Sequence, residues 1–326
     1  MAPTPVKLVY GGAMFGTAFP TPKEIGIVYD ALKEAGVSTI DTAKIYGDSE
    51  ELMGKTPGTK DFTIDTKWPS GFNPGSATKD GIISQADDSY KKLGVDKIDI
   101  FYLHAPDRDV DFAETLQGVD AVYKKGYFSR LGLSNFSADE VRQIYNYTKE
   151  HGIVQPSVYQ GNYSAVARKI ETELFPTLRE LGISFYAYSP IAGGFLVKTR
   201  QQIEEGAGRF NEQTLGGMYN RLYNRSSYLE ALDKWQATAK KEGVTAAELA
   251  YRWIGFHSKL SVEKGDAVIF GTSKVEQIPL TASYLKAGPL SEEAAKSVEE
   301  VWSLVESDAP LDNYEVFKPS DVPGNA

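Results

Sequence analysis

Hydrophobic and polar positions follow two periodicities along most of the chain. Short runs rich in Val, Ile, Phe and Tyr predict buried strands, and between them apolar residues recur every three or four positions, as in amphipathic helices. The stretch 22–35, for example, places Ile25, Val28, Tyr29 and Leu32 on one stripe. The predicted strands are 6–12, 38–42, 62–67, 98–104, 129–135, 156–160, 184–190 and 267–273. The other predicted helices are 76–93, 112–125, 138–150, 169–181 and 245–256.

The ends of the predicted helices agree with this division. Thr21 is a good N-cap with Pro22 at the first turn, and glycines follow four of the helical stretches, at positions 36, 94, 152 and 182. Strands that alternate with helices predict a parallel sheet covered on both faces. Eight such units predict a closed (β/α)8 barrel, the TIM barrel of the α/β class, as a single domain over 1–326. A doubly wound open sheet is the alternative, but no G-x-G-x-x-G turn follows the first strand.

Two regions break the alternation of strands and helices. Residues 191–227 are rich in Gly and Asn with little periodicity, which predicts a long loop after the seventh strand. A loop of this length in a compact domain is more often functional than idle. After Leu290 the pattern predicts an extra helix over 291–306, followed by a Pro-containing stretch to the C-terminus.

Composition excludes several classes of site. Lys and Arg total 35 and Asp and Glu 44, for a net charge of −9, so the chain has no general attraction for nucleic acid or anionic lipid. The absence of cysteine excludes disulfides, thiolate nucleophiles and cysteine-ligated metals, and three histidines argue against a multi-histidine metal site. No apolar run approaches about 18 residues, and the N-terminus does not resemble an export signal. We therefore expect a cytoplasmic protein with no metal.

The carboxyl ends of the strands carry the candidate chemistry, because parallel barrels place their active sites at that face. Asp41 and Tyr46 follow the second strand, Lys67 ends the third and His104 ends the fourth. A lysine ammonium beside a phenol is expected to lower the tyrosine pKa, while a carboxylate orients the lysine and a neutral histidine hydrogen-bonds the substrate oxygen. Such a phenol can protonate a developing alkoxide. Because no side chain donates hydride, the partner must be a reduced cofactor.

Each of these four residues also has an ordinary structural interpretation. Asp41 suits an N-cap, Tyr46 a packing position, Lys67 a solvated strand end and His104 a buried core histidine. Their occurrence at successive strand ends of one barrel favours the catalytic interpretation. One chemical alternative is a barrel lyase or isomerase in which Lys67 forms a Schiff base.

Long motifs resemble the aldo-keto reductase superfamily, which has a (β/α)8 fold and uses NADPH. They are DTAKIYGDSEELMG (41–54), DTKWP (65–69), DIFYLHAPD (99–107), LGLSNFS (131–137) and FYAYSPIAGGFL (185–196). Residues 158–194, 208–210 and 218–232 further resemble the aflatoxin aldehyde reductase branch. The likeness extends from about residue 8 to 305. It implies reduction of an aldehyde or ketone, and the branch suggests a homodimer.

The resemblance implies a role for each matching residue. Tyr46 would be the general acid, tuned by Lys67 and by Asp41, which also lies near the nicotinamide ribose, and His104 would orient the carbonyl. Three side chains would hold the carboxamide, namely Ser134, Asn135 and Gln160, and Tyr188 would stack on the nicotinamide. The residues expected at the pyrophosphate are Ser189, Pro190, Gly193, Gly194 and Leu196, and Lys198 is the expected phosphate-binding lysine. Those expected at the adenosine end and its 2′-phosphate are Arg209, Gly271, Thr272, Ser273, Lys274 and Gln277.

Departures from the family pattern concern the 2′-phosphate. Lys198 is displaced by about one residue, and Gln277 and Thr281 stand where many relatives have Arg and Asn. Lys274 or Arg209 could supply the charge instead, which keeps NADPH as the expected cofactor. The expected substrate pocket consists of Met14, Phe15, Trp68, His104, Tyr163, Tyr223 and Arg225. It suits an aryl aldehyde, or a semialdehyde if an arginine binds its carboxylate. A cofactor-binding regulatory subunit with little turnover, similar to potassium-channel β subunits, is the alternative function.

Overall fold

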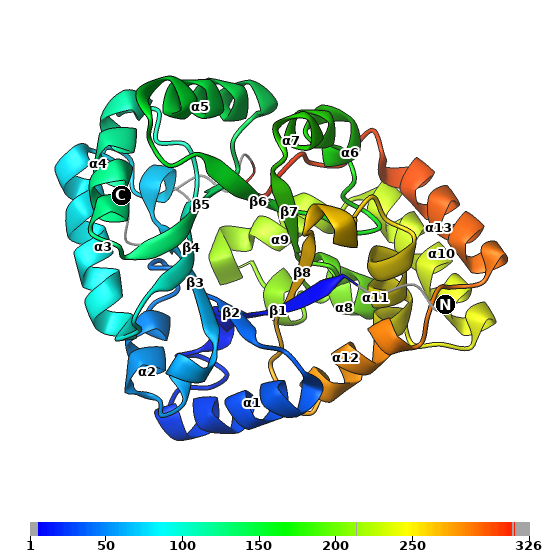
Figure 1. The fold of residues 1–326 in the computed structure, drawn as a ribbon. Coiled ribbons are helices and arrows are strands. Elements are labelled where there is room, and N and C mark those ends of the chain that lie inside the picture. The colour runs from blue at the N-terminus through cyan, green and yellow to red at the C-terminus, as the bar shows by residue number, and fades with distance from the viewer. Residues whose placement is uncertain (1–5, 213, 315, 317–326) are drawn as a thin grey trace.

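The computed structural model describes residues 6–212, 214–314 and 316, and the C-terminal stretch 317–326 lies outside them. Within the described residues, eight parallel strands close into a barrel in chain order (Figure 1). The strands are β1 (Lys7–Gly11), β2 (Thr39–Asp41), β3 (Thr63–Trp68), β4 (Ile98–Leu103), β5 (Phe128–Ser134), β6 (Pro156–Asn162), β7 (Ser184–Tyr188) and β8 (Ala267–Phe270). All eight predicted strands are present, and the predicted TIM barrel is confirmed.

Helices surround this barrel and cover its outer face (Figure 1). They are α1 (Pro22–Ala35), α2 (Ser49–Lys55), α3 (Lys79–Leu93), α4 (Phe112–Lys124), α5 (Ala138–His151), α6 (Ile170–Glu173), α7 (Phe175–Leu181), α8 (Arg200–Glu204), α9 (Met218–Tyr223), α10 (Ser226–Glu242), α11 (Ala246–Phe256), α12 (Gln277–Lys286) and α13 (Glu292–Val305). The caps follow the sequence signals. Thr21 and Glu24 form a capping box on α1, and Gly36 ends that helix in the left-handed conformation, as predicted.

The segment after β7 differs from the predicted loop. Residues 191–227 contain short helical pieces, including α8 and α9, and they lead directly into α10, which the sequence pattern did not predict. The predicted helix 169–181 is divided at Leu174 into α6 and α7. Pro176 accounts for this break, because proline cannot donate the backbone hydrogen bond that would continue the preceding turn.

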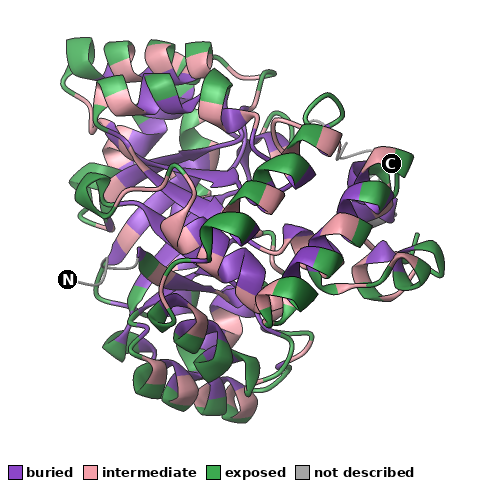
Figure 2. Cartoon of the chain, turned by 90° about the vertical axis from the view of Figure 1, so that its right-hand side faces the viewer, coloured by how far each residue is buried: buried purple, intermediate pink, exposed green. Residues whose placement is uncertain are grey.

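Buried residues gather in the strands of the barrel and on parts of the helices that surround them (Figure 2). Outward-facing strand residues are buried against the helices in one large apolar core. The interior contains a smaller apolar group that includes Val9, Ile100 and Ile269. Charged side chains share this interior, among them Asp65 and Lys67, neither of which is exposed. The barrel lumen is therefore polar just below the mouth where the candidate chemistry lies.

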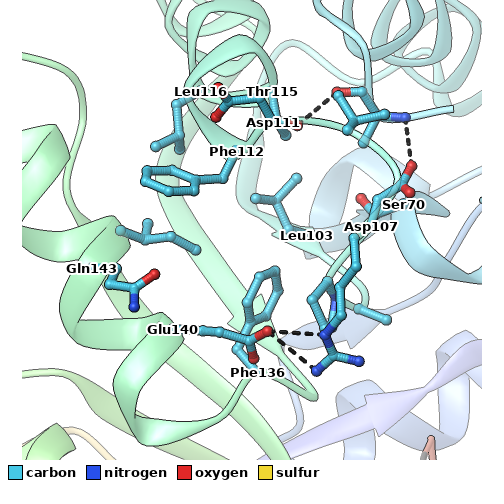
Figure 3. Close-up of a pocket in the computed structure, with 16 residues that line it drawn as sticks. Ser70, Leu103, Asp107, Asp111, Phe112, Thr115, Leu116, Phe136, Glu140 and Gln143 are labelled. Atoms are coloured by element: carbon cyan, nitrogen blue, oxygen red, sulfur yellow. Dashed lines mark hydrogen bonds and ion pairs between the residues drawn. The ribbon is translucent and has the colours of Figure 1, made fainter. Parts of the chain in front are cut away.

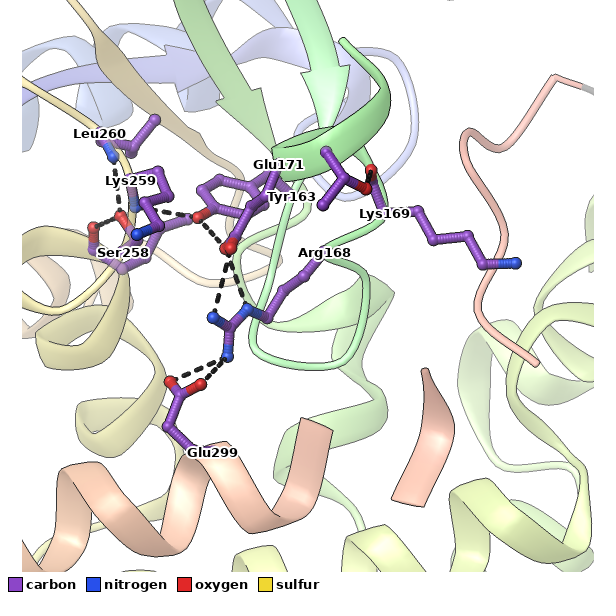
Figure 4. Close-up of polar contacts among 10 residues, drawn as sticks. Tyr163, Arg168, Lys169, Glu171, Ser258, Lys259, Leu260 and Glu299 are labelled. Carbon is purple, nitrogen blue, oxygen red and sulfur yellow. Dashed lines mark hydrogen bonds and ion pairs between the residues drawn. The ribbon is translucent and has the colours of Figure 1, made fainter. Parts of the chain in front are cut away.

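Arg168 connects the segment after β6 to the C-terminal helix (Figure 4). Its guanidinium donates to Glu171 at 2.9 Å and to both carboxylate oxygens of Glu299 on α13 at 2.9 Å. It also lies over the ring of Trp253, 5.3 Å from its centroid. The network holds α13 against the barrel.

Among the described residues, no helix is both long and apolar enough to cross a membrane.

Candidate active site

Four side chains from successive strand ends converge at the mouth of the barrel. Lys67 donates to Asp41 Oδ2 at 2.6 Å and to the Thr42 carbonyl at 2.6 Å, and its ammonium lies 5.3 Å from the ring centroid of Tyr46. The Tyr46 and His104 rings meet edge to face at 6.0 Å. Because strands β2, β3 and β4 are neighbours in register, residues far apart in sequence reach one point.

Tyr46 is held as a neutral phenol. Burial raises its pKa above the usual range, and the nearby Asp41 and Tyr219 add to this, while Arg209 opposes it. The expected net lowering of this pKa is therefore not found, because burial is the largest influence on it. The ammonium already bonds Asp41 and lies over the face of the ring, and the described residues show no hydrogen bond between it and the phenol hydroxyl.

His104 is also held neutral. Burial lowers its pKa well below the usual value, and the Lys67 ammonium lowers it further. Among the described residues its buried Nδ1 has no hydrogen-bond partner. Phe72 packs against the imidazole with ring centroids 4.7 Å apart. The histidine is therefore an uncharged group beside Tyr46.

Asp41 connects this set to the residues expected at the nicotinamide. Its Oδ1 accepts a hydrogen bond from Gln160 Nε2 at 3.0 Å, while burial raises its pKa against the opposing effects of Lys67 and Gln160. Asn135 donates to the His104 carbonyl at 2.8 Å and to Ser134 Oγ at 3.1 Å. The Asn135 Oδ1 is buried with no partner among the described residues, which leaves an acceptor for an amide N–H.

The residues expected to hold a pyrophosphate follow β7. The backbone of Ser189, Gly193 and Gly194 has positive φ angles of 58°, 65° and 100°. A Cβ on Gly194 would meet no atom within 4 Å, so this turn is open to a ligand. Pro190 and Leu196 are buried, and Lys198, which pairs with no carboxylate among the described residues, lies beside Gly208. Tyr188 remains partly exposed at the end of β7.

The segment after β8 exposes Gly271, Ser273 and Lys274, while Thr272 is buried and bonds Tyr10. Gln277 accepts from the backbone N–H groups of Ser273 and Lys274 at 3.0 and 3.2 Å. Gln277 thus orders this turn from within. Lys274 is left as an exposed cation beside it.

Arg209, expected at the adenosine end, lies close enough to Tyr46 for its charge to act on that phenol. It donates to Tyr219 Oη at 2.9 Å and to Met14 Sδ at 3.7 Å, and its charge acts on Tyr46. The segment after β7 therefore folds across the mouth and brings α9 over the barrel (Figure 1). Arg209 therefore lies near Tyr46, and no contact joins it to Lys274 among the described residues.

Three of the expected pocket residues face away from the mouth. Phe15 packs against Tyr29 beneath α1, with ring centroids 6.3 Å apart. Trp68 stacks on Phe101 at 3.7 Å and donates to the Ile82 carbonyl of α3, so it lies outside the barrel wall. Tyr163 packs against helices α7 and α11, and its hydroxyl donates to Glu171. These are core residues, and the expectation that they line the pocket is wrong.

The remaining expected pocket residues lie in different surroundings. Met14 is partly exposed beside Arg209. Tyr223 is buried on α9, where its hydroxyl accepts from Asn162 at 3.4 Å. Arg225 is the N-cap residue of α10, and its guanidinium donates to the Arg221 and Asp308 carbonyls at 3.0 and 3.1 Å. Its N–H groups are therefore partly engaged in contacts within the chain.

Sequence reasoning missed an aromatic wall from distant segments. Phe72, which follows β3, packs on His104 and on Tyr314 of the C-terminal segment, whose ring centroid is 4.9 Å away. Tyr314 donates to the Gly71 carbonyl at 2.9 Å, and Asn162 donates to Asn313 at 2.9 Å. The sequence could have indicated Phe72, because it closely follows the strand end that carries Lys67. No local pattern in the sequence points to Tyr314.

Two cavities adjoin the strand ends. One of about 380 Å³ lies between the starts of α5 and α6, and its lining includes Asn135, Gly161, Asn162 and Asp312. The other, of about 260 Å³, lies between α4 and α5 and is lined by residues such as Leu103, Phe112 and Phe136 (Figure 3). None of the four convergent residues lines either cavity, so both are separate from the candidate chemistry.

Comparisons with known proteins agree with the fold. A family model described as "Aldo/keto reductase family" matches residues 7–303. An oxidoreductase called sirO from Leptosphaeria maculans is 38% identical over 303 residues, covering 92% of this chain and 91% of its own. Aflatoxin B1 aldehyde reductase member 2 from Rattus norvegicus is 37% identical over 300 residues, covering 87% of this chain and 81% of its own. Human aldo-keto reductase family 7 member A3 is 35% identical over 321 residues, covering 94% and 96%. The chain therefore belongs to the aldo/keto reductase family.

Proposed function

We propose that this protein is an NADPH-dependent reductase of aldehydes or ketones, with Tyr46 as the general acid. The observation that carries the proposal is the convergence of Tyr46, Lys67, Asp41 and His104 at one mouth of the barrel. The family of this chain supports carbonyl reduction with a nicotinamide cofactor in general.

The protonation states suit this chemistry. Tyr46 keeps its proton because burial raises its pKa, so it is available to the alkoxide that forms when a carbonyl is reduced. The Lys67 ammonium, fixed by Asp41, lies against the same ring and stabilises negative charge as it develops on the phenol. Neutral His104 orients the carbonyl oxygen by a hydrogen bond.

The cofactor would be held along the strand ends from β5 to β8. The free acceptor of Asn135 fits the amide of a nicotinamide, and Ser134 and Gln160 lie beside it. The turn at Gly193 and Gly194, which is open on the Gly194 side, fits a pyrophosphate. NADPH supplies the hydride when bound. Lys198 and Lys274 are the cations that would favour a 2′-phosphate, which supports NADPH over NADH.

The wall beside His104 favours an apolar or aryl aldehyde. Phe72 and Tyr314 pack in series from the imidazole outwards, and they offer ring faces rather than charge. The name of the rat relative, an aldehyde reductase, supports an aldehyde as substrate. Arg209, whose charge acts on Tyr46, is the cation through which a semialdehyde carboxylate would be recognised.

The Schiff-base alternative is disfavoured by the contacts of Lys67. Its side chain is fully buried and its ammonium is bound to a carboxylate and a carbonyl, so no free amine is available as a nucleophile. The regulatory-subunit alternative predicts NADPH binding without turnover.

The deciding experiment measures NADPH oxidation by its absorbance with 4-nitrobenzaldehyde and with succinic semialdehyde. We expect turnover in the wild type and a loss of roughly 10²-fold or more in kcat for Tyr46→Phe, because the proton donor is removed. NADPH affinity, measured by fluorescence, should not change. Tyr123→Phe, at a tyrosine 40% exposed on α4, is the matched control. Retained turnover in Tyr46→Phe would discard Tyr46 as the acid, and binding without turnover in the wild type would favour the regulatory subunit.

A further inference from the structure

The Lys67 ammonium lies between two aromatic rings. Its Nζ is 5.3 Å from the ring centroid of Tyr46 and 5.6 Å from that of Tyr102. Two of its three N–H groups donate to Asp41 and Thr42. The rings lie within the distance at which a cation is attracted to an aromatic face, and the attraction is strongest when the cation is desolvated, as here.

The ring of Tyr102 is held in this place by the barrel wall. Tyr102 is in register with Lys67 on β3 and with Gly132 on β5. A Cβ on Gly132 would come within 2.2 Å of Tyr102 Cδ1 and 2.5 Å of its Cε1, so glycine is needed at this position for space. The Tyr102 hydroxyl is buried, and the side chain that it faces is Gln160. The ring, and not the hydroxyl, therefore makes the contact with the cation.

We propose that Tyr102 is a positioning residue for the reduction, whose ring holds the Lys67 ammonium against Tyr46. The inference rests on the proposed function of Tyr46 and Lys67. Gly132 takes part by leaving room for the ring.

Asp65 explains why a ring is needed at this point. It precedes Lys67 by two residues on β3, and alternate residues of a strand face the same side. Its buried Oδ2 has no partner among the described residues. Without the Tyr102 ring, the flexible Lys67 side chain would have space to move deeper into the barrel. There it could contact a second carboxyl group, that of Asp65. The ammonium would then move away from Tyr46, where charge develops in the reaction.

Substitutions at Tyr102 distinguish the effect of its aromatic face from the effect of the volume that it fills. Tyr102→Leu and Tyr102→Met remove the aromatic face, and we expect kcat to fall roughly tenfold. The KM for the aldehyde and the affinity for NADPH should stay unchanged, because only the transition state loses an interaction. Tyr102→Phe keeps the face and should recover the lost turnover. The double variant Tyr102→Leu/Gly132→Ala refills part of the cavity, so it should regain stability against urea but not kcat.

A spectroscopic readout reports the position of Lys67 directly. Methylene groups of lysine that lie over aromatic rings give upfield-shifted NMR signals, which are visible in protein labelled with carbon-13 at lysine Cε and are assigned by Lys67→Met. We expect this shift in the wild type and in Tyr102→Phe, and its reduction in Tyr102→Leu and Tyr102→Met.

Three results would overturn the inference. They are wild-type kcat in both aliphatic variants, recovery of kcat in the double variant, and a Lys67 signal that does not move. If only one aliphatic variant folds, that variant decides. An inactive wild type would instead refute the proposed function, and the NMR shift would still report whether Tyr102 positions Lys67.

Discussion

The buried pair of Asp41 and Lys67 makes a prediction about stability that does not depend on substrate. The Lys67 side chain is 0% exposed and the Asp41 side chain 3%, with 2.6 Å between Nζ and Oδ2. Removal of one partner of such a pair leaves an uncompensated charge and typically costs about 3–5 kcal/mol of unfolding free energy. Joint removal costs less, because no buried charge remains. We therefore consider Asp41→Asn, Lys67→Met and the double variant.

The two single variants should differ in their dependence on pH. In Lys67→Met, Asp41 retains only the Gln160 amide as a partner, and burial already raises its pKa in the wild type. A carboxyl whose pKa is higher in the folded than in the unfolded state binds more protons when folded, so stability is lost as pH rises through the folded pKa. We therefore expect Lys67→Met to lose stability between about pH 5 and pH 8. Asp41→Asn lacks this carboxyl and should lose less over the same range.

Urea unfolding followed by tryptophan fluorescence measures all four proteins of this cycle. We expect each single variant at neutral pH to lose about 3 kcal/mol, with Lys67→Met closer to wild type at acidic pH. The interaction energy of the cycle should be about 2 kcal/mol or more, within the range for directly contacting residues. The reasoning would be refuted by additive losses, or by a Lys67→Met protein whose deficit does not grow with pH.

Three further substitutions test other parts of the structure. The pKa of Asp65 is raised well above its usual value by burial and by Asp41, so Asp65→Asn should match wild type in urea near pH 4 and exceed it near pH 8. Gly193→Ala places a Cβ 1.8 Å from Tyr219 at a φ of 65°, so it should cost more than about 1 kcal/mol of stability and lower kcat, which activity assays and thermal melts would detect. Arg168→Met breaks the bonds to Glu171 and Glu299, and because the Glu299 side chain is 54% exposed we expect a loss nearer about 2 kcal/mol than 5, measured in urea.

The identity of the four convergent residues was predictable because the barrel fixes where strands end. A parallel barrel brings every carboxyl end to one mouth, so Asp41, Lys67 and His104 need only lie at the ends of successive strands to meet. Helices such as α2, α10 and α12 were not predicted, because the closure of the barrel does not fix where they begin and end. The helix α10 follows a segment without clear periodicity, and its start at Ser226 has no side-chain cap.

The failed pocket residues show a constraint that the sequence already contained. Successive residues of a strand face opposite sides, so Lys67 and Trp68 cannot both point into the barrel. Once Lys67 is assigned to the interior, Trp68 belongs against α3, where the structure places it. Tyr314 and Phe72 could not be found in this way. Their contact joins residues far apart in sequence and depends on how the C-terminal segment crosses the mouth.

The direction of the Tyr46 pKa shift depends on burial, which sequence position alone does not give. The Lys67 ammonium would by itself lower the pKa of Tyr46, but the Asp41 carboxylate bonded to it acts in the opposite direction. A phenol with a raised pKa remains protonated throughout the neutral range, so the residue is suited to give a proton rather than to take one. Deprotonation of the product alcohol would need the opposite state of Tyr46. In the proposed reduction, burial therefore keeps Tyr46 in the protonated state that an alkoxide needs, because burial outweighs the neighbouring cation.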